Sequence, residues 1–206
     1  MRERLQALID QEEVGRHDAI LLGYGLCGNG VAGLAATKAQ LVIPRAHDCI
    51  TLLMGSRERY QEYFERNPGV YFRSTGWLER GEDQDQETLH VIRDRTGAGQ
   101  TLKELVARYG EENGQYLYDE LNAYRRTYRK LTYISTGLEP DGHFEAEARQ
   151  EAAKNNWNFE SIPGSLQLFE RLVCGQWDER DFLVVPPGWR VTATYDGKVI
   201  GKEPAA

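Results

Sequence analysis

The sequence predicts an α/β protein made of two similar β-α-β-α-β halves, with mostly parallel sheets and a cleft between the halves. Short apolar runs that end in glycine or proline alternate with segments of helical periodicity, and the same order of elements occurs twice. Of the 206 residues, 40% are hydrophobic and 28% are charged, which is the balance of a globular chain with a buried core. We expect an N-terminal α/β half at 1–80, connector and crossover helices at 81–129 and a C-terminal α/β half at 130–206, with one compact domain as the alternative.

The N-terminal half is built from short strands and two helices. Apolar side chains at helical spacing predict the longer helix, and the sequence Asn67-Pro-Gly ends it. The glycines that follow the first strand allow positive φ and a close approach to a ligand. The expected elements are a strand at 18–25, a helix at 31–37, a strand at 40–44, a helix at 48–66 and a strand at 70–73.

The C-terminal half repeats this order. Both second strands end in Ile-Pro, and both third strands end in Gly-Trp, at Trp77 and Trp189. The matches predict an internal duplication; the alternative is one irregular open sheet in which they are coincidental. The expected elements are strands at 130–134, 159–163 and 181–189, helices at 144–155 and 165–174, connector helices at 101–109 and 115–128, and a loose tail at 201–206.

Charge and cysteine content narrow the function classes. The net charge is −7 and there is no basic stripe, which argues against nucleic acid or an anionic membrane as a partner. No apolar stretch approaches the roughly 20 residues of a membrane-spanning helix, and the N-terminus lacks the apolar run of a signal peptide. Three cysteines do not make a disulfide framework, so we expect a cytoplasmic protein with free thiols.

The loops at the carboxyl ends of the strands are expected to share one rim, where parallel βαβ units bind ligands. Cys27 lies in a glycine-rich loop, and the sequence Arg45-Ala-His-Asp-Cys49 joins a strand to a helix. Asp48 is typical of a helix N-cap, and a thiol in the first helical turn has its thiolate stabilised by the helix dipole. His47 is near enough to Cys49 in the sequence to share a ligand with it.

These residue types indicate a metal ion or a metal-containing cofactor in the cleft. Thiolate and imidazole suit zinc, iron or the metal of a tetrapyrrole. Cys27, His47 and Cys49 would supply three ligands, and His143 a fourth. Cys174, late in its helix, is expected to be a small buried hydrophobic residue. Residues expected to orient the ligand or bind an anionic group are Gly25, Gly28, Asn29, Gly30, Arg45 and Asp48.

Other interpretations use the same loops. Residues 23–33 contain two overlapping Gly-x-Gly-x-x-Gly patterns of nucleotide binding, although the next strand lacks the acidic residue that binds a ribose. Cys27 and Cys49 would also serve as a redox pair, or one of them as a nucleophile beside His47. Without a metal, the two thiols would be buried and His47 would cap a helix. A further alternative is an accessory protein that binds a partner and carries out no chemistry.

Three segments carry a resemblance to a known family. They are Tyr24-Gly-Leu-Cys-Gly-Asn-Gly30, the stretch from Ile43 to Ser56 and the stretch from Gly175 to Gly188. The sequence resembles a domain of unknown function, family number 1638, of methanogens and anaerobic bacteria, whose members often accompany corrinoid-dependent methyltransferases. The resemblance implies an anaerobic, one-carbon setting, a corrinoid as cofactor and methyltransferase proteins as partners. It implies no catalytic role for any residue.

Overall fold

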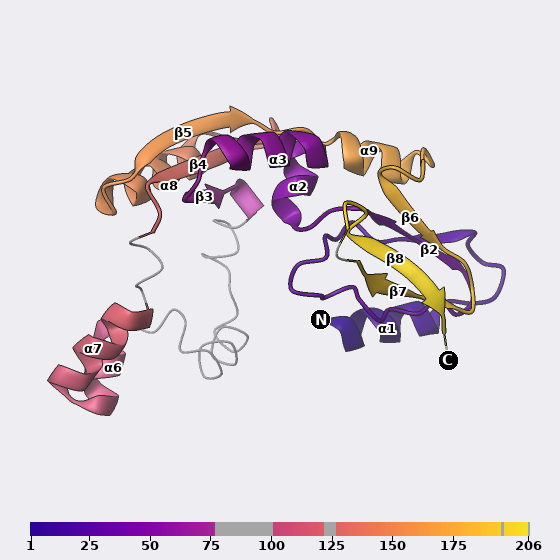
Figure 1. Ribbon diagram of the computed structural model, residues 1–206, viewed down its shortest axis with the longest axis horizontal. Coiled ribbons are helices and arrows are strands. Elements are labelled where there is room, and N and C mark those ends of the chain that lie inside the picture. Colours follow the sequence, from indigo (N-terminus) through magenta and orange to yellow (C-terminus); the bar gives the residue numbers. More distant parts are fainter. Residues whose placement is uncertain (77–100, 122–126, 195, 206) are drawn as a thin grey trace. The chain divides into compact units, whose positions relative to one another are not determined.

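The computed structural model describes residues 1–76, 101–121, 127–194 and 196–205, which include seven helices and eight strands (Figure 1). Contacts between residues group the chain into two compact units. Unit 1 consists of Met1–Arg66 and Pro163–Ala206, and unit 2 of Asn67–Ile162. In this described part of the chain, no helix is long and apolar enough to cross a bilayer.

A three-stranded sheet with the order β1-β2-β6 forms the centre of unit 1. Its strands are β1 (Ala19–Leu21), β2 (Gln40–Pro44) and β6 (Phe182–Val185). β1 pairs with β2 in parallel, whereas β6 runs antiparallel to β2 with Leu41 opposite Val185. The sheet is therefore mixed.

Side chains of β2 alternate between two apolar layers, because successive residues of a strand point to opposite faces of the sheet. Leu41 and Ile43 belong to one layer, together with apolar residues of α1 (Arg2–Gln11) and of the hairpin formed by β7 (Trp189–Ala193) and β8 (Ile200–Pro204). This strand is buried on both faces and anchors the unit.

The second layer of unit 1 covers the opposite face of β2. Val42 packs there with Leu52 of α2 (Cys49–Met54) and with leucines of α9 (Gln167–Val173). After α2 the chain continues in α3 (Arg57–Arg66), which has no fully buried side chain. The more exposed α3 thus follows directly after α2, the helix that begins at Cys49.

Unit 2 contains the sheet β3-β4-β5, in which β3 and β4 are parallel. One face is covered by α8 through Phe144, Ala148 and Ala152. Two further helices, α6 and α7, pack on each other, and a Cβ at Gly114 of α7 would lie 2.6 Å from the backbone of Val106. The elements are β3 (Val70–Arg73), β4 (Lys130–Ser135), β5 (Asn158–Pro163), α6 (Leu102–Tyr109), α7 (Glu111–Leu121) and α8 (His143–Lys154).

The helix predicted at 48–66 is two helices, α2 and α3. Gly55 separates them with a φ of 79°, and a Cβ at this position would lie 2.6 Å from the side chain of Ser165. The αL conformation ends a helix and is costly for residues other than glycine. The predicted stop at Asn67 is confirmed, because α3 ends at Arg66.

The small helix predicted at 31–37 is wrong. This segment runs alongside β7 instead, and the amide of Gly33 donates to the carbonyl of Val191 at 2.8 Å. Ala35 forms an isolated bridge with Arg190. Hydrogen bonds to another strand satisfy this backbone, so it does not close a helical turn.

The strands pair differently from the predicted two-half arrangement. β3 pairs with β4 and β6 pairs with β2, so each of these sheets combines strands from 1–80 and 130–206. Because β6 is antiparallel to β2, the loop at 187–189 leaves the sheet at the edge opposite to the loops after β1 and β2. One common rim for all six loops is therefore wrong. The internal duplication and the cleft stay predictions.

The end of the chain is more ordered than predicted. Residues 201–204, expected in a loose tail, belong to β8, which pairs with β7 in an antiparallel hairpin. Trp189 begins β7 instead of ending the preceding strand. Trp77 and the connector segments 77–100 and 122–126 lie outside the described residues.

Candidate functional site

Two loops at the carboxyl ends of β1 and β2 pack against each other in unit 1. The amide of Cys27 donates to the carbonyl of His47 at 2.8 Å. Gly25 allows this approach, because a Cβ there would lie 2.7 Å from the backbone of Asp48. The parallel pairing of β1 with β2 therefore brings these two predicted loops together.

Cys27 begins a tight left-handed turn. Cys27, Gly28 and Asn29 have φ values of 31°, 60° and 65°, and the amide of Gly30 closes the turn by donating to the carbonyl of Leu26 at 2.8 Å. Glycine and asparagine adopt positive φ more readily than other residues. Cys27 is thus the strained member of the turn, and its side chain is exposed.

The thiols of Cys27 and Cys49 lie close together, near enough for Cys27 to contribute to the pKa of Cys49. Both cysteines are free; Cys49 is half-buried at the first residue of α2. Burial raises the pKa of Cys49 to about 12, with further contributions from Cys27 and from the carboxylate of Asp48. The expectation that the helix dipole stabilises this thiolate is therefore wrong, because α2 is short and burial and neighbouring acids dominate.

Asp48 organises the second loop. As predicted, it is the N-cap of α2, and its Oδ1 accepts from the amide of Thr51 at 3.0 Å and from the hydroxyl of Thr51 at 3.1 Å. The carboxylate also interacts with the hydroxyl of Tyr60 on α3. The pKa of Tyr60 is raised to about 12, mainly by burial and further by Asp48. The carboxylate of Asp48 is thus already bound to Thr51 and Tyr60 of the chain.

The two predicted histidine ligands occupy different places. His47 is exposed and lines a cavity beside α3. His143 begins α8 in unit 2, where its Nδ1 hydrogen-bonds Asp141 and its ring packs on Phe144. In the described part of the chain, no group of three or more His, Cys, Asp or Glu side chains is arranged to hold a metal ion. The structure brings together the two thiols of the predicted set.

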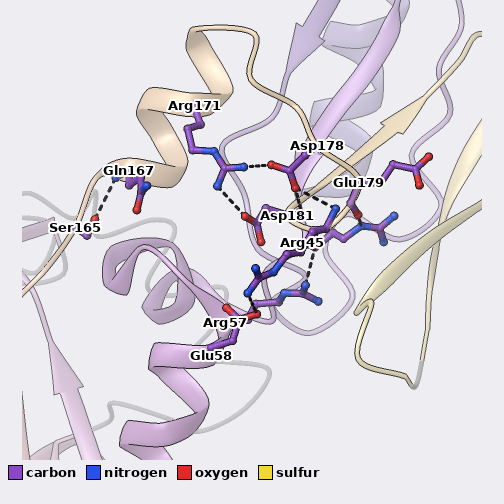
Figure 2. Close-up of polar contacts among 10 residues, drawn as sticks. Arg45, Arg57, Glu58, Ser165, Gln167, Arg171, Asp178, Glu179 and Asp181 are labelled. Atoms are coloured by element: carbon purple, nitrogen blue, oxygen red, sulfur yellow. Dashed lines mark hydrogen bonds and ion pairs between the residues drawn. The ribbon is translucent and has the colours of Figure 1, made fainter.

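Arg45 binds backbone carbonyls of neighbouring segments. Its Nε donates to the carbonyl of Glu179 at 2.9 Å (Figure 2). Its Nη1 donates to the carbonyls of Lys198 and Ile200. These bonds fasten the end of β2 to the β7–β8 hairpin. Burial is the first cause that lowers the pKa of Arg45, and the nearby guanidinium of Arg57 adds to it.

Other predicted positions are exposed. Gly28 and Asn29 line a shallow depression with the N-terminal residues Met1, Arg2 and Glu3. Cys174 is exposed at the end of α9, so its prediction as a buried residue is wrong. The helix ends at Val173, one residue after the last buried leucine of its apolar face, and Cys174 therefore lies beyond that face.

The cavity beside α3 was not foreseen from the sequence. It measures about 280 Å³ and is lined by His47, Arg57, Glu58, Tyr60, Gln61, Phe64 and Gly197. The positions 57, 60, 61 and 64 follow the i, i+3, i+4, i+7 spacing of one helix face. A second signal is Asp196-Gly197 between β-branched runs, which is typical of a hairpin turn.

Comparison with known proteins gives one match. A family model with the description Protein of unknown function (DUF1638) matches residues 1–173. The matched range contains Cys27, Cys49 and α3. No curated protein and no solved structure matches the chain.

Proposed function

The chain belongs to the family described as Protein of unknown function (DUF1638), and we propose that it binds a thiophilic metal ion, zinc or iron, through Cys27 and Cys49. The observation that supports this function is the proximity of two free thiols that come from separate loops. Thiolates are preferred ligands of zinc and iron, and two on adjacent loops make a preformed half of a tetrahedral site.

The residues around the thiols limit what such an ion would do. A bound cation would stabilise both thiolates and act as a Lewis acid toward a ligand at an open position. Asp48 already caps α2, and no third His, Cys, Asp or Glu side chain of the described residues is placed to complete the site, so water or a ligand from outside the chain would fill the remaining positions. A corrin ring is larger than the neighbouring cavity of about 280 Å³ can enclose, so the ligand proposed is the ion itself. Association with corrinoid methyltransferases stays an expectation from the resemblance.

The test is a titration of anaerobic, chelator-treated protein with cobalt(II), whose absorption reports thiolate ligands. We expect one equivalent to bind with a thiolate charge-transfer band. Cys27→Ser and Cys49→Ser should each weaken binding by about tenfold or more, since each removes one of the two ligands. Cys174→Ser is the matched control, because Cys174 is exposed at the end of α9 and should not affect binding. Binding that survives both Cys27→Ser and Cys49→Ser would refute the proposal.

The proximity of the two free thiols favours a second candidate, reversible disulfide formation. A low-molecular-weight disulfide would accept the electrons: the two protein thiols become one Cys27–Cys49 disulfide, and the reagent becomes two small thiols. Peptide mass spectrometry of metal-free protein exposed to oxidised glutathione would detect the crosslinked peptide. Cys174 joined to either partner, or glutathione adducts without the crosslink, would count against this function.

A further inference from the structure

The cavity beside α3 has the composition of a small-molecule site. One wall is the helix face that carries Tyr60, Gln61 and Phe64, and the exposed His47, from the loop that leads to Cys49, also lines the cavity. Its volume of about 280 Å³ suits a ligand of a few heavy atoms. Phe64 is 48% exposed, so an apolar surface accompanies the polar groups.

Arg57 supplies a cationic group whose hydrogen-bonding capacity is only partly used. Its Nη1 donates to the carbonyl of Gly197 and its Nη2 donates to the carbonyl of Arg180 at 2.7 Å. Within the described residues, its Nε is buried without a hydrogen-bond partner, and no carboxylate accepts a hydrogen bond from this guanidinium. Each Nη uses one of its two N–H groups for a backbone carbonyl, so the second N–H of each Nη remains as a donor for a ligand.

Charged groups of both signs surround Arg57. Glu58 also lines the cavity; its carboxylate accepts a hydrogen bond from Arg180 at 2.7 Å and interacts electrostatically with Arg57 as well. A second guanidinium, that of Arg45, lies close enough to Arg57 for mutual repulsion, and Figure 2 shows both side chains reaching the same region. The acids Glu179 and Asp196 lie near Arg45, but the hydrogen bonds of both guanidiniums go to backbone carbonyls, so no carboxylate of the described residues occupies the donors of Arg57.

We propose that this cavity binds the oxyanion of a small ligand, a carboxylate or a phosphate, with Arg57 as the principal contact and His47 and Tyr60 beside it. A guanidinium matches the planar or tetrahedral array of oxygen acceptors in such groups. Tyr60 joins the cavity to the thiol loops, because its hydroxyl interacts with Asp48, next to Cys49. A ligand held by its oxyanion would thus extend toward the thiol pair.

The experiment is calorimetric titration of chelator-treated protein at low ionic strength with inorganic phosphate in one series and succinate in another. The tighter of the two identifies the oxyanion class. Arg57→Gln should weaken that binding by about tenfold or more, the loss expected for a charged hydrogen bond, and Arg57→Lys should lose less. Arg16→Gln is the matched control, since it removes one positive charge at an exposed position beside Glu13.

Two further variants keep the test decisive. If Arg57→Gln does not fold, His47→Ala changes only an exposed side chain and should still weaken binding severalfold. Cys27→Ser should retain phosphate or succinate binding, so failure of the metal proposal and failure of this one are distinguishable. The proposal is overturned if neither anion binds, or if Arg57→Gln and His47→Ala bind as Arg16→Gln does.

Discussion

Asp48→Ala tests whether the thiol loop depends on a single helix cap. The substitution removes the acceptor for the amide of Thr51, which costs about 1 kcal/mol for an N-cap. It also leaves the hydroxyl of Thr51, a fully buried residue, without its acceptor, which costs about 1–3 kcal/mol. We therefore expect the free energy of unfolding to fall by about 2–4 kcal/mol. Asp48→Asn keeps an acceptor at the cap and should lose under about 1 kcal/mol.

Urea denaturation followed by far-ultraviolet circular dichroism measures this difference. With a slope of about 2 kcal/mol per M, the midpoint of Asp48→Ala should fall by about 1–2 M. The control is Asp10→Ala, which removes an exposed acceptor of Gln6 on α1 and should change stability by under about 0.5 kcal/mol. The reasoning is refuted if Asp48→Ala matches Asp10→Ala, or if Asp48→Asn is as destabilising as Asp48→Ala.

Three other predictions follow, one from the geometry at Gly55 and two from the burial of Cys49. Gly55→Ala should lower the melting temperature more than Gly175→Ala. Both glycines have positive φ, at 79° and 74°, but only at Gly55 would the added Cβ meet another side chain, that of Ser165 at 2.6 Å. Equal melting temperatures of the two variants would contradict this prediction. In metal-free protein at about pH 9, iodoacetamide should modify the exposed thiols of Cys27 and Cys174 before Cys49, whose pKa is raised from 9.0 to about 12. The folded state keeps the thiol of Cys49 neutral, whereas the unfolded chain ionises it. The free energy of unfolding should therefore fall as the pH rises from 9.0 toward about 12. Cys49→Ala should reduce that fall. Peptide mass spectra measure the order of alkylation, and alkaline unfolding curves measure the loss of stability. If Cys49 reacts as fast as Cys27, both the order of alkylation and the raised pKa behind the loss of stability are contradicted.

The elements that local sequence determines were predictable. The strands at 40–44 and 70–73 are confirmed at the predicted residues, because each is a short apolar run bounded by turn residues. The resemblance to family number 1638 is also confirmed. Of the candidate site, the contact between the loops of Cys27 and Cys49 was predictable, since both loops follow neighbouring parallel strands.

Strand partners were not predictable in the same way. β6 and β3 are both short apolar strands, and nothing in their periodicity indicates that β6 pairs with β2 while β3 pairs with β4. Partner choice depends on contacts between residues far apart in the chain, which a local pattern does not contain. The pKa of Cys49 shows the same limit, because helix position alone predicts a decrease, and burial beside Cys27 and Asp48 reverses the sign.

The strain at Cys27 connects the fold to the proposed site. At a φ of 31°, a residue other than glycine costs about 1–2 kcal/mol, so folding stability alone would favour glycine here, as it does at the adjoining Gly28. Such strain persists where the surroundings enforce it, and it concentrates at functional sites. The cysteine contributes no buried apolar area that offsets the cost, because its side chain is exposed. What the side chain does contribute is a thiol close to Cys49, and the proposed metal or disulfide chemistry requires two thiols close together.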